Sequence, residues 1–175
     1  MTPIRLTGPR VVLRSTTPDD AARLLPIRNE PEVRRWWSDL EPGEMEEFVA
    51  DEHSLAIEVD GEVVGAVQYG EEEDPMYRHA NIDVYLAGSR HGRGLGSEAV
   101  RLLARYLLEE RGHHRLTIDP AAANTAAIRA YEKVGFRSVG VMRSYEQGPD
   151  GTWHDGLLMD LLAGELIDDD PSPSD

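Results

Sequence analysis

The chain has 175 residues, of which 40% are hydrophobic and 29% are charged, and its formal net charge is −15 at pH 7. This length suits one packed domain and is short for two, and the apolar content argues against a disordered chain. Acidic surface repels phosphate backbones, which argues against nucleic acid as a partner. The absence of cysteine excludes disulfides, thiolate metal sites and cysteine nucleophiles.

The acidity is not confined to the C-terminal residues. Without the five acids of residues 165–175, the rest of the chain still carries a charge of −10. Such a surface concentrates cations, so cationic ligands are favoured, although the same charge can serve solubility alone. The sequence has neither a signal-peptide core nor an uninterrupted apolar run of about 18 residues. We therefore expect a cytoplasmic protein that does not bind membranes.

A short strand and three helices are expected first in chain order. The run RVVLR at residues 10–14 predicts the strand. Thr17 followed by Pro18 is a helix-start signal, because the hydroxyl can cap free N–H groups and proline suits the first helical position. Pro31 then ends this helix. The expected helices cover residues 17–29, 32–37 and 43–51.

Three strands are expected next. Residues 55–59 and 63–69 are rich in β-forming side chains. They are joined by Asp60 and Gly61, the dipeptide favoured in type I′ hairpin turns. Residues 79–87 then predict a third strand, antiparallel to its predecessor.

The second half of the chain mixes helices and strands. Residues 94–110 carry apolar side chains at a period of about 3.6 residues, which predicts an amphipathic helix. The expected later elements are a strand at 116–119, a helix at 124–134, and a hairpin of strands at 136–145 and 153–162. Residues 165–175 are rich in Asp, Pro and Ser and predict a disordered tail. Together these elements predict a mixed α+β fold with one domain at residues 1–164.

A glycine-rich segment lies between the third strand and the amphipathic helix. Residues 91–97, with the sequence HGRGLGS, are called the glycine loop below. Glycines let the backbone turn tightly and approach a ligand, and N–H groups at a helix start bind anions such as pyrophosphate. A plain turn with a helix cap is one alternative. A Rossmann loop is another, but it would follow the first strand of a βαβ unit, whereas hairpin strands precede this loop.

A second motif, NTAAIRAYEKVGF at residues 124–136, begins 28 residues after Gly96. On its own, this helix could simply bury Ala127, Ile128 and Tyr131 against a sheet. Together, the two motifs resemble the acyl-coenzyme A site of the GNAT N-acetyltransferase superfamily. That family has a Q/RxxGxG/A loop followed by an NxxAxxxYEKxGF segment. Here His91 stands where the family usually has Gln or Arg.

The resemblance implies a GNAT fold, with a central, mostly antiparallel twisted sheet of about six to seven strands and about four flanking helices. It also implies acetyl-coenzyme A as cosubstrate and no metal. A β-bulge near the end of the strand before the loop would let backbone amides polarise the thioester carbonyl. The residues implied to hold the coenzyme are Leu86, His91, Gly92, Arg93, Gly94, Leu95, Gly96, Ser97, Asn124, Tyr131 and Lys133.

Asp83 is the expected general base, because an amine must lose a proton to attack a thioester and a carboxylate can accept it. By the two-residue alternation of a strand, Tyr85 would share its face. Asp119, at the end of the next strand, is the second candidate, as base or as partner of an acceptor ammonium group. A surface carboxylate and a turn cap are the alternatives for these two acids. The place of Tyr131 in the family motif implies that its phenol protonates the departing thiolate.

Three further segments resemble the aminoglycoside 6′-N-acetyltransferase branch of the family. They are Trp36 and Trp37 after Pro-Glu-Val, the residues Ile82, Asp83, Leu86 and Ala87, and the stretch Thr117, Ile118, Asp119, Pro120 with Asn124. The openings LTGPRVVLR and TTPDDAARLL instead resemble the group that contains ribosomal-protein N-terminal acetyltransferases. The branch of the family is therefore left open.

The expected activity is transfer of an acetyl group from acetyl-coenzyme A to a primary amine of a small cationic acceptor. An aminoglycoside, and hence antibiotic resistance, is the leading case. The alternatives are a ribosomal-protein N-terminus, a siderophore-type lysine, or a coenzyme-binding regulator without catalysis. We expect a monomer or homodimer. The expected acceptor residues are Trp36, Trp37, Glu72, Glu73, Asp74, Asp83, Tyr85, Asp119 and Asp155. The four consecutive acids at residues 71–74 could instead form a solvated loop, and the two tryptophans could be core residues.

Overall fold

The computed structural model describes residues 2–168, in which eight strands form one sheet. The strands are β1 Arg5–Thr7, β2 Val11–Ser15, β3 Ser54–Val59, β4 Glu62–Glu72, β5 His79–Leu86, β6 Arg115–Ile118, β7 Arg137–Gln147 and β8 Trp153–Leu162. The α-helices are α1 Ala21–Arg28, α2 Pro31–Arg34, α3 Glu44–Ala50, α4 Leu95–Arg105 and α5 Thr125–Val134. A π-helical turn, Tyr106–Glu110, extends α4. None of these helices has the length and apolar character that crossing a membrane requires.

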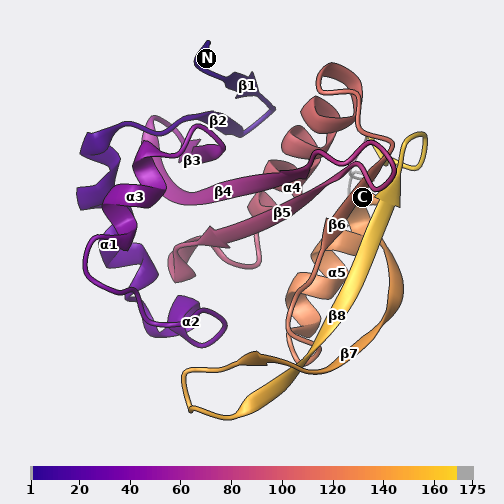
Figure 1. The fold of residues 1–175 in the computed structure, drawn as a ribbon. Coiled ribbons are helices and arrows are strands. Elements are labelled where there is room, and N and C mark those ends of the chain that lie inside the picture. Colours follow the sequence, from indigo (N-terminus) through magenta and orange to yellow (C-terminus); the bar gives the residue numbers. More distant parts are fainter. Residues whose placement is uncertain (1, 169–175) are drawn as a thin grey trace, which may run out of the picture.

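The sheet has the strand order β1-β2-β3-β4-β5-β6-β8-β7. Every neighbouring pair is antiparallel except β5 with β6, which is parallel. In Figure 1, β5 stays beside β4 while β6 runs beside β8, so the two parallel strands point in different directions. This divergence between two halves of one sheet creates the place where the candidate site lies.

The helices cover both faces of the sheet. On one face, buried side chains of α1, α2 and α3 pack against Ala66 and Tyr85. On the other face, α4 and α5 pack on a larger cluster that includes Ile82 and Leu86. Because successive side chains of a strand point to opposite faces, β5 contributes to both layers. Residues of β5 can therefore reach ligands on either side of the sheet.

The mixed α+β fold is confirmed, with eight strands and five α-helices in residues 2–168 where about six to seven and about four were expected. The turn between β3 and β4 is also confirmed. Asp60 and Gly61 have φ angles of 51° and 77°, both in the left-handed region that a type I′ turn requires. The strand β1 was missed because its three residues contain one apolar side chain, too few to form a pattern.

Residues 165–168, the expected beginning of the tail, contact the body of the domain. The Ile167 N–H donates to the Val134 carbonyl (2.9 Å), and Arg101 Nε donates to the Ile167 carbonyl (2.7 Å). Asp168 forms an ion pair with Arg105 (2.8 Å). The remaining tail residues, 169–175, lie outside the described residues.

Candidate functional site

The strands β5 and β6 are ladder partners only at Ala80–Leu116 and Asn81–Thr117. Beyond these pairs, β5 continues beside β4 as far as Leu86, and β6 follows β8 (Figure 1). In the described chain, no strand pairs with this edge of β5 beyond Asn81. The backbone groups on this edge of β5 therefore lack ladder partners beyond Asn81, and the region where β5 and β6 separate is called the V-shaped opening below.

A cleft of about 600 Å³ occupies this region. It is lined by the end of β5, the glycine loop, the first turn of α4, one face of α5, and residues around the end of α2. All of the residues expected to hold a coenzyme line it, with the exception of Arg93. Two motifs that are far apart in sequence, the glycine loop and the α5 segment, therefore line one cleft.

The glycine loop presents N–H groups at the start of α4. Gly92 and Gly94 have φ angles of 73° and 75°, a region that L side chains rarely adopt. Within residues 2–168, the N–H groups of Gly94, Leu95 and Gly96 donate to no backbone carbonyl. The helix dipole adds positive potential at the same place. The loop therefore fits an anionic group, as a pyrophosphate-binding segment must.

Several contacts fix the surroundings of the loop. One ring nitrogen of His91, Nε2, lies 2.9 Å from the Leu86 carbonyl oxygen, so this residue joins the loop to the end of β5. The Ser97 hydroxyl donates to the Ala130 carbonyl (3.2 Å), which joins α4 to α5. The Asn124 side chain accepts from the Ala127 N–H (3.2 Å) and caps α5. These contacts give His91, Ser97 and Asn124 structural roles within the cleft wall.

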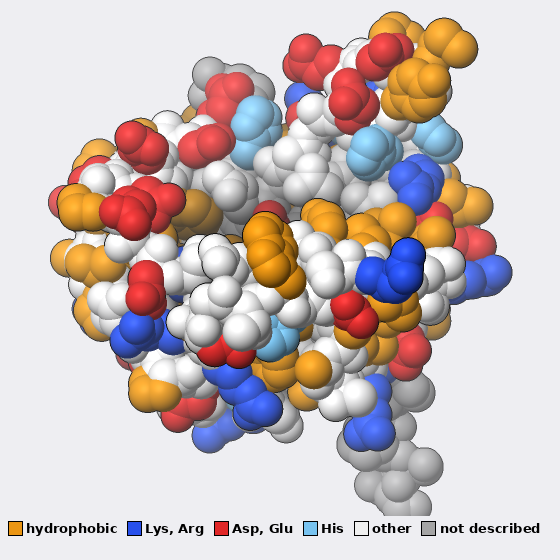
Figure 2. All heavy atoms as spheres, turned by 60° about the horizontal axis from the view of Figure 1, so that its bottom comes forward, with side chains coloured by type: hydrophobic (Ala, Val, Ile, Leu, Met, Phe, Trp, Pro, Cys, Tyr) orange, Lys and Arg blue, Asp and Glu red, His pale blue; other side chains and the backbone are white. Residues whose placement is uncertain are grey.

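The charge of the cleft lining is opposite to that of the whole chain. Arg35, Arg90, Arg129 and Lys133 line it, whereas Glu32 is its single carboxylate. Figure 2 shows that charge is also unevenly distributed on one face, with acidic groups at the left and upper right and Lys and Arg mainly along the lower and right-hand parts. A basic lining in an acidic protein favours an anionic ligand.

Of these four cations, sequence reasoning found only Lys133. Arg129 was detectable in principle, because it lies four residues before Lys133 and therefore on the same face of α5. Arg35 and Arg90 reach the cleft from the end of α2 and from the turn after β5. No local pattern indicates that convergence.

The bulge expected near Leu86 is not in β5. The pairing of β4 with β5 is regular through the pair Gly65–Leu86. The irregularity lies in the neighbouring pair of strands, where β3 and β4 shift register between Ile57 and Glu58. Gly65 explains the close approach at this point, since a Cβ there would lie 2.2 Å from the Tyr85 carbonyl oxygen.

Asp83 and Asp119 lie at the base of the V-shaped opening. Asp83 is two residues beyond Asn81 and Asp119 is two beyond Thr117, the last residues through which β5 and β6 pair with each other. The Asp83 side chain is exposed to solvent. Desolvation by the surrounding protein, followed by the negative charges of Asp119 and Glu146, nevertheless raises the pKa of Asp83 to about 6. Asp83 is therefore mostly a carboxylate at neutral pH, with an unusually high proton affinity.

Tyr131 joins the two acids from the α5 side. Its side chain is 8% exposed and lines the cleft. Burial, together with the charges of Asp83 and Asp119, raises its pKa above the ordinary value. The phenol therefore keeps its proton at neutral pH and can act as a donor. The structure thus brings together the three residues expected to perform the chemistry, Asp83, Asp119 and Tyr131.

Sequence reasoning missed Tyr145 and Glu146, which complete this group from β7. Hydrogen bonding to the Asp119 carboxylate is the main cause that raises the pKa of Tyr145, to about 12. Burial and then the Asp119 charge raise the pKa of Glu146. Both residues were predicted only as the end of a strand or the loop after it, where nothing indicates proximity to Asp119.

Asp155, on the neighbouring strand β8, stabilises a bulge in β7. The pairing register jumps from Met142–Gly156 to Glu146–His154, so three residues of β7 stand opposite Asp155 alone. Ser144, in this bulge, has a φ of 47°, and its N–H donates to Asp155 Oδ1 (2.9 Å). The Asp155 carboxylate, expected to bind an acceptor, is instead engaged in holding the bulge.

Trp36 and Trp37, which were expected to contact the acceptor, both line the cleft. The Trp37 ring meets Tyr85 edge-on, with centroids 5.5 Å apart. The guanidinium of Arg28 lies 4.9 Å from the Trp37 ring centroid and 5.6 Å from that of Tyr85. Arg28 is only 5% exposed, and burial lowers its pKa. An internal cation therefore already occupies one face of each ring, a contact that no sequence pattern indicated.

The acidic segment at residues 71–74 does not join the cleft. Glu71 and Glu72 belong to β4, and Glu72 pairs with His79 at the opposite end of β5 from Leu86. The offset of seven residues from His79 to Leu86 corresponds to about 23 Å at strand geometry. Glu71 pairs with Arg111 (2.7 Å) and His113 (2.5 Å) beyond the end of α4. The expected acceptor role of Glu72, Glu73 and Asp74 is therefore not supported by their placement.

The coupling of the two aspartates can be tested directly. We expect Asp119→Asn to lower the pKa of Asp83 from about 6, because it removes a like charge. The pKa should stay above the ordinary range, since burial remains the largest cause. Carbon-13 NMR titration of the carboxyl groups measures this shift. Glu73→Gln, in the connection between β4 and β5, is the control. An equal Asp83 titration midpoint in the two variants would contradict the coupling.

Comparison with known proteins gives three relevant similarities. The family model described as an acetyltransferase (GNAT) domain matches residues 10–137. Aminoglycoside N(6′)-acetyltransferase type 1 of Klebsiella pneumoniae is 30% identical over 164 residues, covering 81% of this chain and 79% of that protein. Spermidine N(1)-acetyltransferase of Escherichia coli (strain K12) is 24% identical over 173 residues, covering 93% and 91% of the two chains.

Among solved structures, RimJ of Mycobacterium smegmatis in complex with CoA-disulfide superimposes with a TM-score of 0.80. It is 27% identical, and the match covers 94% of this chain and 87% of that chain. The span 10–137 includes β5, the glycine loop and α5, and so covers the segments that line the cleft.

Proposed function

The chain belongs to the GNAT acetyltransferase family, and on that premise we propose that it transfers an acetyl group from acetyl-coenzyme A to a primary amine of a small cationic acceptor. The observation that carries the proposal is that Tyr131 connects the cleft with the acids. The glycine loop and Tyr131 both line the cleft, and Tyr131 lies near enough to Asp83 and Asp119 for their charges to raise its pKa. This is the arrangement that a direct transfer between two bound substrates needs.

The cleft residues fit the coenzyme by charge and by hydrogen-bonding capacity. The N–H groups from Gly94 to Gly96 suit a pyrophosphate, and Arg129 and Lys133 suit the remaining phosphate. The edge of β5 that has no ladder partner beyond Asn81 offers backbone groups to the amides of the coenzyme's pantetheine arm. When bound, acetyl-coenzyme A would supply an acetyl group activated as a thioester.

Asp83 is suited to accept the proton of the acceptor. A cationic amine is protonated at neutral pH and must lose a proton to become a nucleophile. A carboxylate with a pKa of about 6 is ionised at pH 7 and is more basic than an ordinary one. The difference between its pKa and that of the ammonium group is therefore smaller, which makes proton transfer less unfavourable. Tyr131, which keeps its proton, is suited to donate to the sulfur as the thioester bond breaks.

The remaining acids support a polycationic acceptor. Asp119 and Glu146 raise the pKa of Asp83, so three carboxylates share a small volume. Their mutual repulsion is relieved when a cation binds between them. An acceptor with more than one ammonium group could occupy Asp83 with one and Asp119 with another. Aminoglycosides and polyamines have this chemistry, whereas a peptide N-terminus offers one ammonium group. A coenzyme-binding regulator without catalysis would have no need of this group of acids.

An acceptor screen tests the proposal. Free thiol released from acetyl-coenzyme A is measured with an aminoglycoside, a polyamine, a lysine derivative and an N-terminal peptide. We expect the two polycationic acceptors to give the highest kcat/KM. Preference for the peptide would shift the assignment to the ribosomal-protein type, and preference for the lysine derivative to the siderophore type. Absence of thiol release with every amine, despite coenzyme binding, would indicate a regulator.

Glu146→Gln is expected to raise the KM for a polycationic acceptor about tenfold, because one charge-assisted contact is worth about 1.5 kcal/mol. The KM for acetyl-coenzyme A should not change, since Glu146 does not line the coenzyme cleft. Steady-state kinetics with each substrate varied separately measures both constants. Glu73→Gln removes the same charge at the distant hairpin and should leave both constants unchanged. Equal acceptor KM values in the two variants would show that Glu146 does not contact the acceptor.

A further inference from the structure

Arg10, which lies outside the coenzyme cleft, makes a contact with the backbone of the glycine loop. It sits just before β2, and its Nη1 donates to the Arg93 carbonyl (2.7 Å). Arg93 lies in the middle of the loop but does not line the cleft. The N-terminal part of the chain therefore holds a peptide group of a segment more than eighty residues away.

The geometry of the peptide group gives this contact a consequence. In a planar trans peptide, the C=O and the following N–H point in opposite directions. When Arg10 holds the Arg93 carbonyl outside the cleft, the N–H of Gly94 must point the other way. Gly94 lines the cleft, and its N–H donates to no backbone carbonyl of residues 2–168, so this N–H is available to the proposed phosphate position.

The loop needs such a restraint from outside. Gly92 and Gly94 flank the Arg93 residue and both have positive φ, and glycine moves between backbone conformations at little cost. Of the other backbone bonds, the one from the His91 N–H to the Gly88 carbonyl holds the start of the loop, and the one from the Glu98 N–H to the Gly94 carbonyl holds the peptide after the Arg93–Gly94 peptide. The central peptide group could therefore rotate if its carbonyl were free.

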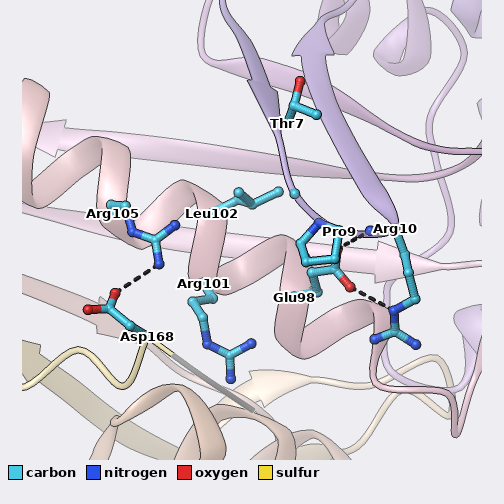
Figure 3. A pocket seen from close by; sticks show the side chains of 9 residues that line it. Thr7, Pro9, Arg10, Glu98, Arg101, Leu102, Arg105 and Asp168 are labelled. Carbon is cyan, nitrogen blue, oxygen red and sulfur yellow. Dashed lines mark hydrogen bonds and ion pairs between the residues drawn. The ribbon is translucent and has the colours of Figure 1, made fainter.

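Glu98 keeps Arg10 in place. Its Oε2 accepts from Arg10 Nε (2.9 Å), and its Oε1 accepts from the backbone N–H groups of Arg10 (2.7 Å) and Val11 (2.9 Å). Figure 3 shows Arg10 and Glu98 facing each other, with the Arg105–Asp168 pair at the other end of the same pocket. Gly8 leaves room for this carboxylate, since a Cβ there would lie 2.9 Å from Glu98 Oε1.

We propose that Arg10 is a positioning residue for coenzyme binding, which acts by fixing the orientation of the Arg93–Gly94 peptide so that its N–H faces the pyrophosphate. The proposal rests on the proposed function, because it needs coenzyme A in the cleft. It assigns a role to a residue that neither touches the ligand nor lies within either sequence motif.

The test compares Arg10→Met with Arg105→Met. Both variants remove an α4 ion pair in the same pocket, but only Arg10 reaches the loop. The Arg10 side chain is 48% exposed, and Glu98, whose side chain is 9% exposed, keeps its two backbone N–H donors when Arg10 is replaced, so thermal unfolding should be similar in both variants. Calorimetry then measures the affinity of each variant for coenzyme A and for pantetheine, which lacks the pyrophosphate.

We expect Arg10→Met to weaken coenzyme A binding about tenfold, the value of one hydrogen bond to a charged group. Pantetheine binding should be unchanged in Arg10→Met, and both affinities should be unchanged in Arg105→Met. Hydrogen exchange of the amides of residues 92–97 should be faster in unliganded Arg10→Met than in wild type. Arg10→Lys, which keeps the charge but lacks the second donor arm, should behave like Arg10→Met.

The outcomes separate this proposal from the proposed function. Equal coenzyme A affinities in wild type and Arg10→Met would overturn the role of Arg10 and leave the proposed function intact. Equal losses for coenzyme A and pantetheine would also overturn it, because the effect would not pass through the pyrophosphate. A wild-type chain that does not bind coenzyme A at all would overturn the proposed function, and this use of the loop with it.

Discussion

Asp83→Asn is expected to lower kcat about 10³-fold at pH 7, within the range found for removal of a general base. Asparagine has nearly the same shape but cannot accept the proton of an ammonium group. Because its carboxamide keeps the packing at the base of the opening, coenzyme affinity should change little. Pre-steady-state measurement of thiol release in the variant separates the chemical step from product release.

The pH dependence gives a sharper form of this prediction. A base whose pKa is about 6 is protonated and inactive below that pH, so the kcat/KM of wild type should fall as pH drops through about 6. This limb should be absent in Asp83→Asn, whose residual activity should rise at high pH, where more of the acceptor is already a free amine. In Asp119→Asn the limb should remain but move to lower pH.

Those profiles also show what would remove Asp83 from the mechanism. An acidic limb near pH 6 that persists in Asp83→Asn would belong to another group. If the limb instead disappeared in Asp119→Asn and persisted in Asp83→Asn, the base would be Asp119. The two carboxylates influence each other, so the limb must be followed in both single variants.

Tyr131→Phe is expected to lower kcat about 10²-fold, since it removes one proton donor while keeping the ring. Tyr131 is 8% exposed and its pKa is raised, so its phenol holds a proton throughout the working pH range. The departing thiolate of the coenzyme would otherwise have to take its proton from water. The coenzyme Kd from calorimetry should stay within a factor of about two, because the lost group acts in the chemical step.

Tyr69→Phe is the matched control for this loss. Tyr69 is also a buried tyrosine with a raised pKa, but it lies on β4 and does not line the cleft. Its variant should keep wild-type kcat. If Tyr131→Phe and Tyr69→Phe had the same kcat, Tyr131 would be a packing residue of the core, as the apolar face of its helix alone would suggest.

Local sequence patterns were sufficient wherever short-range physics decides the structure. The Asp60-Gly61 turn follows from the left-handed conformation that these two residues accept. The glycine loop follows from the same property and from the amphipathic pattern of α4 behind it. Asn124 and Gly135 mark the ends of α5 because one caps free N–H groups and the other adopts a positive φ.

The acidic segment shows where local patterns fail. Four consecutive acids at residues 71–74 are typical of a solvated loop, and their spacing from the glycine loop says nothing about distance in space. Extension of β4 through Glu72 carries them to the end of β5 away from the cleft. Asp155 is a similar case, since only the bulge in β7 reveals that its carboxylate binds the Ser144 N–H.

The sequence by itself therefore determined the fold class, the family resemblance, the glycine loop and the candidate acids Asp83 and Asp119. These depend on residue type, periodicity and motif spacing, which can be read directly from the sequence. Only the tertiary structure decided that β5 and β6 separate after two pairs, that Tyr145 and Glu146 join Asp119, and that Arg10 reaches Arg93. These arrangements depend on strand order and on the register between segments distant in sequence. Such features are set by the packing of the whole sheet, which no local pattern specifies.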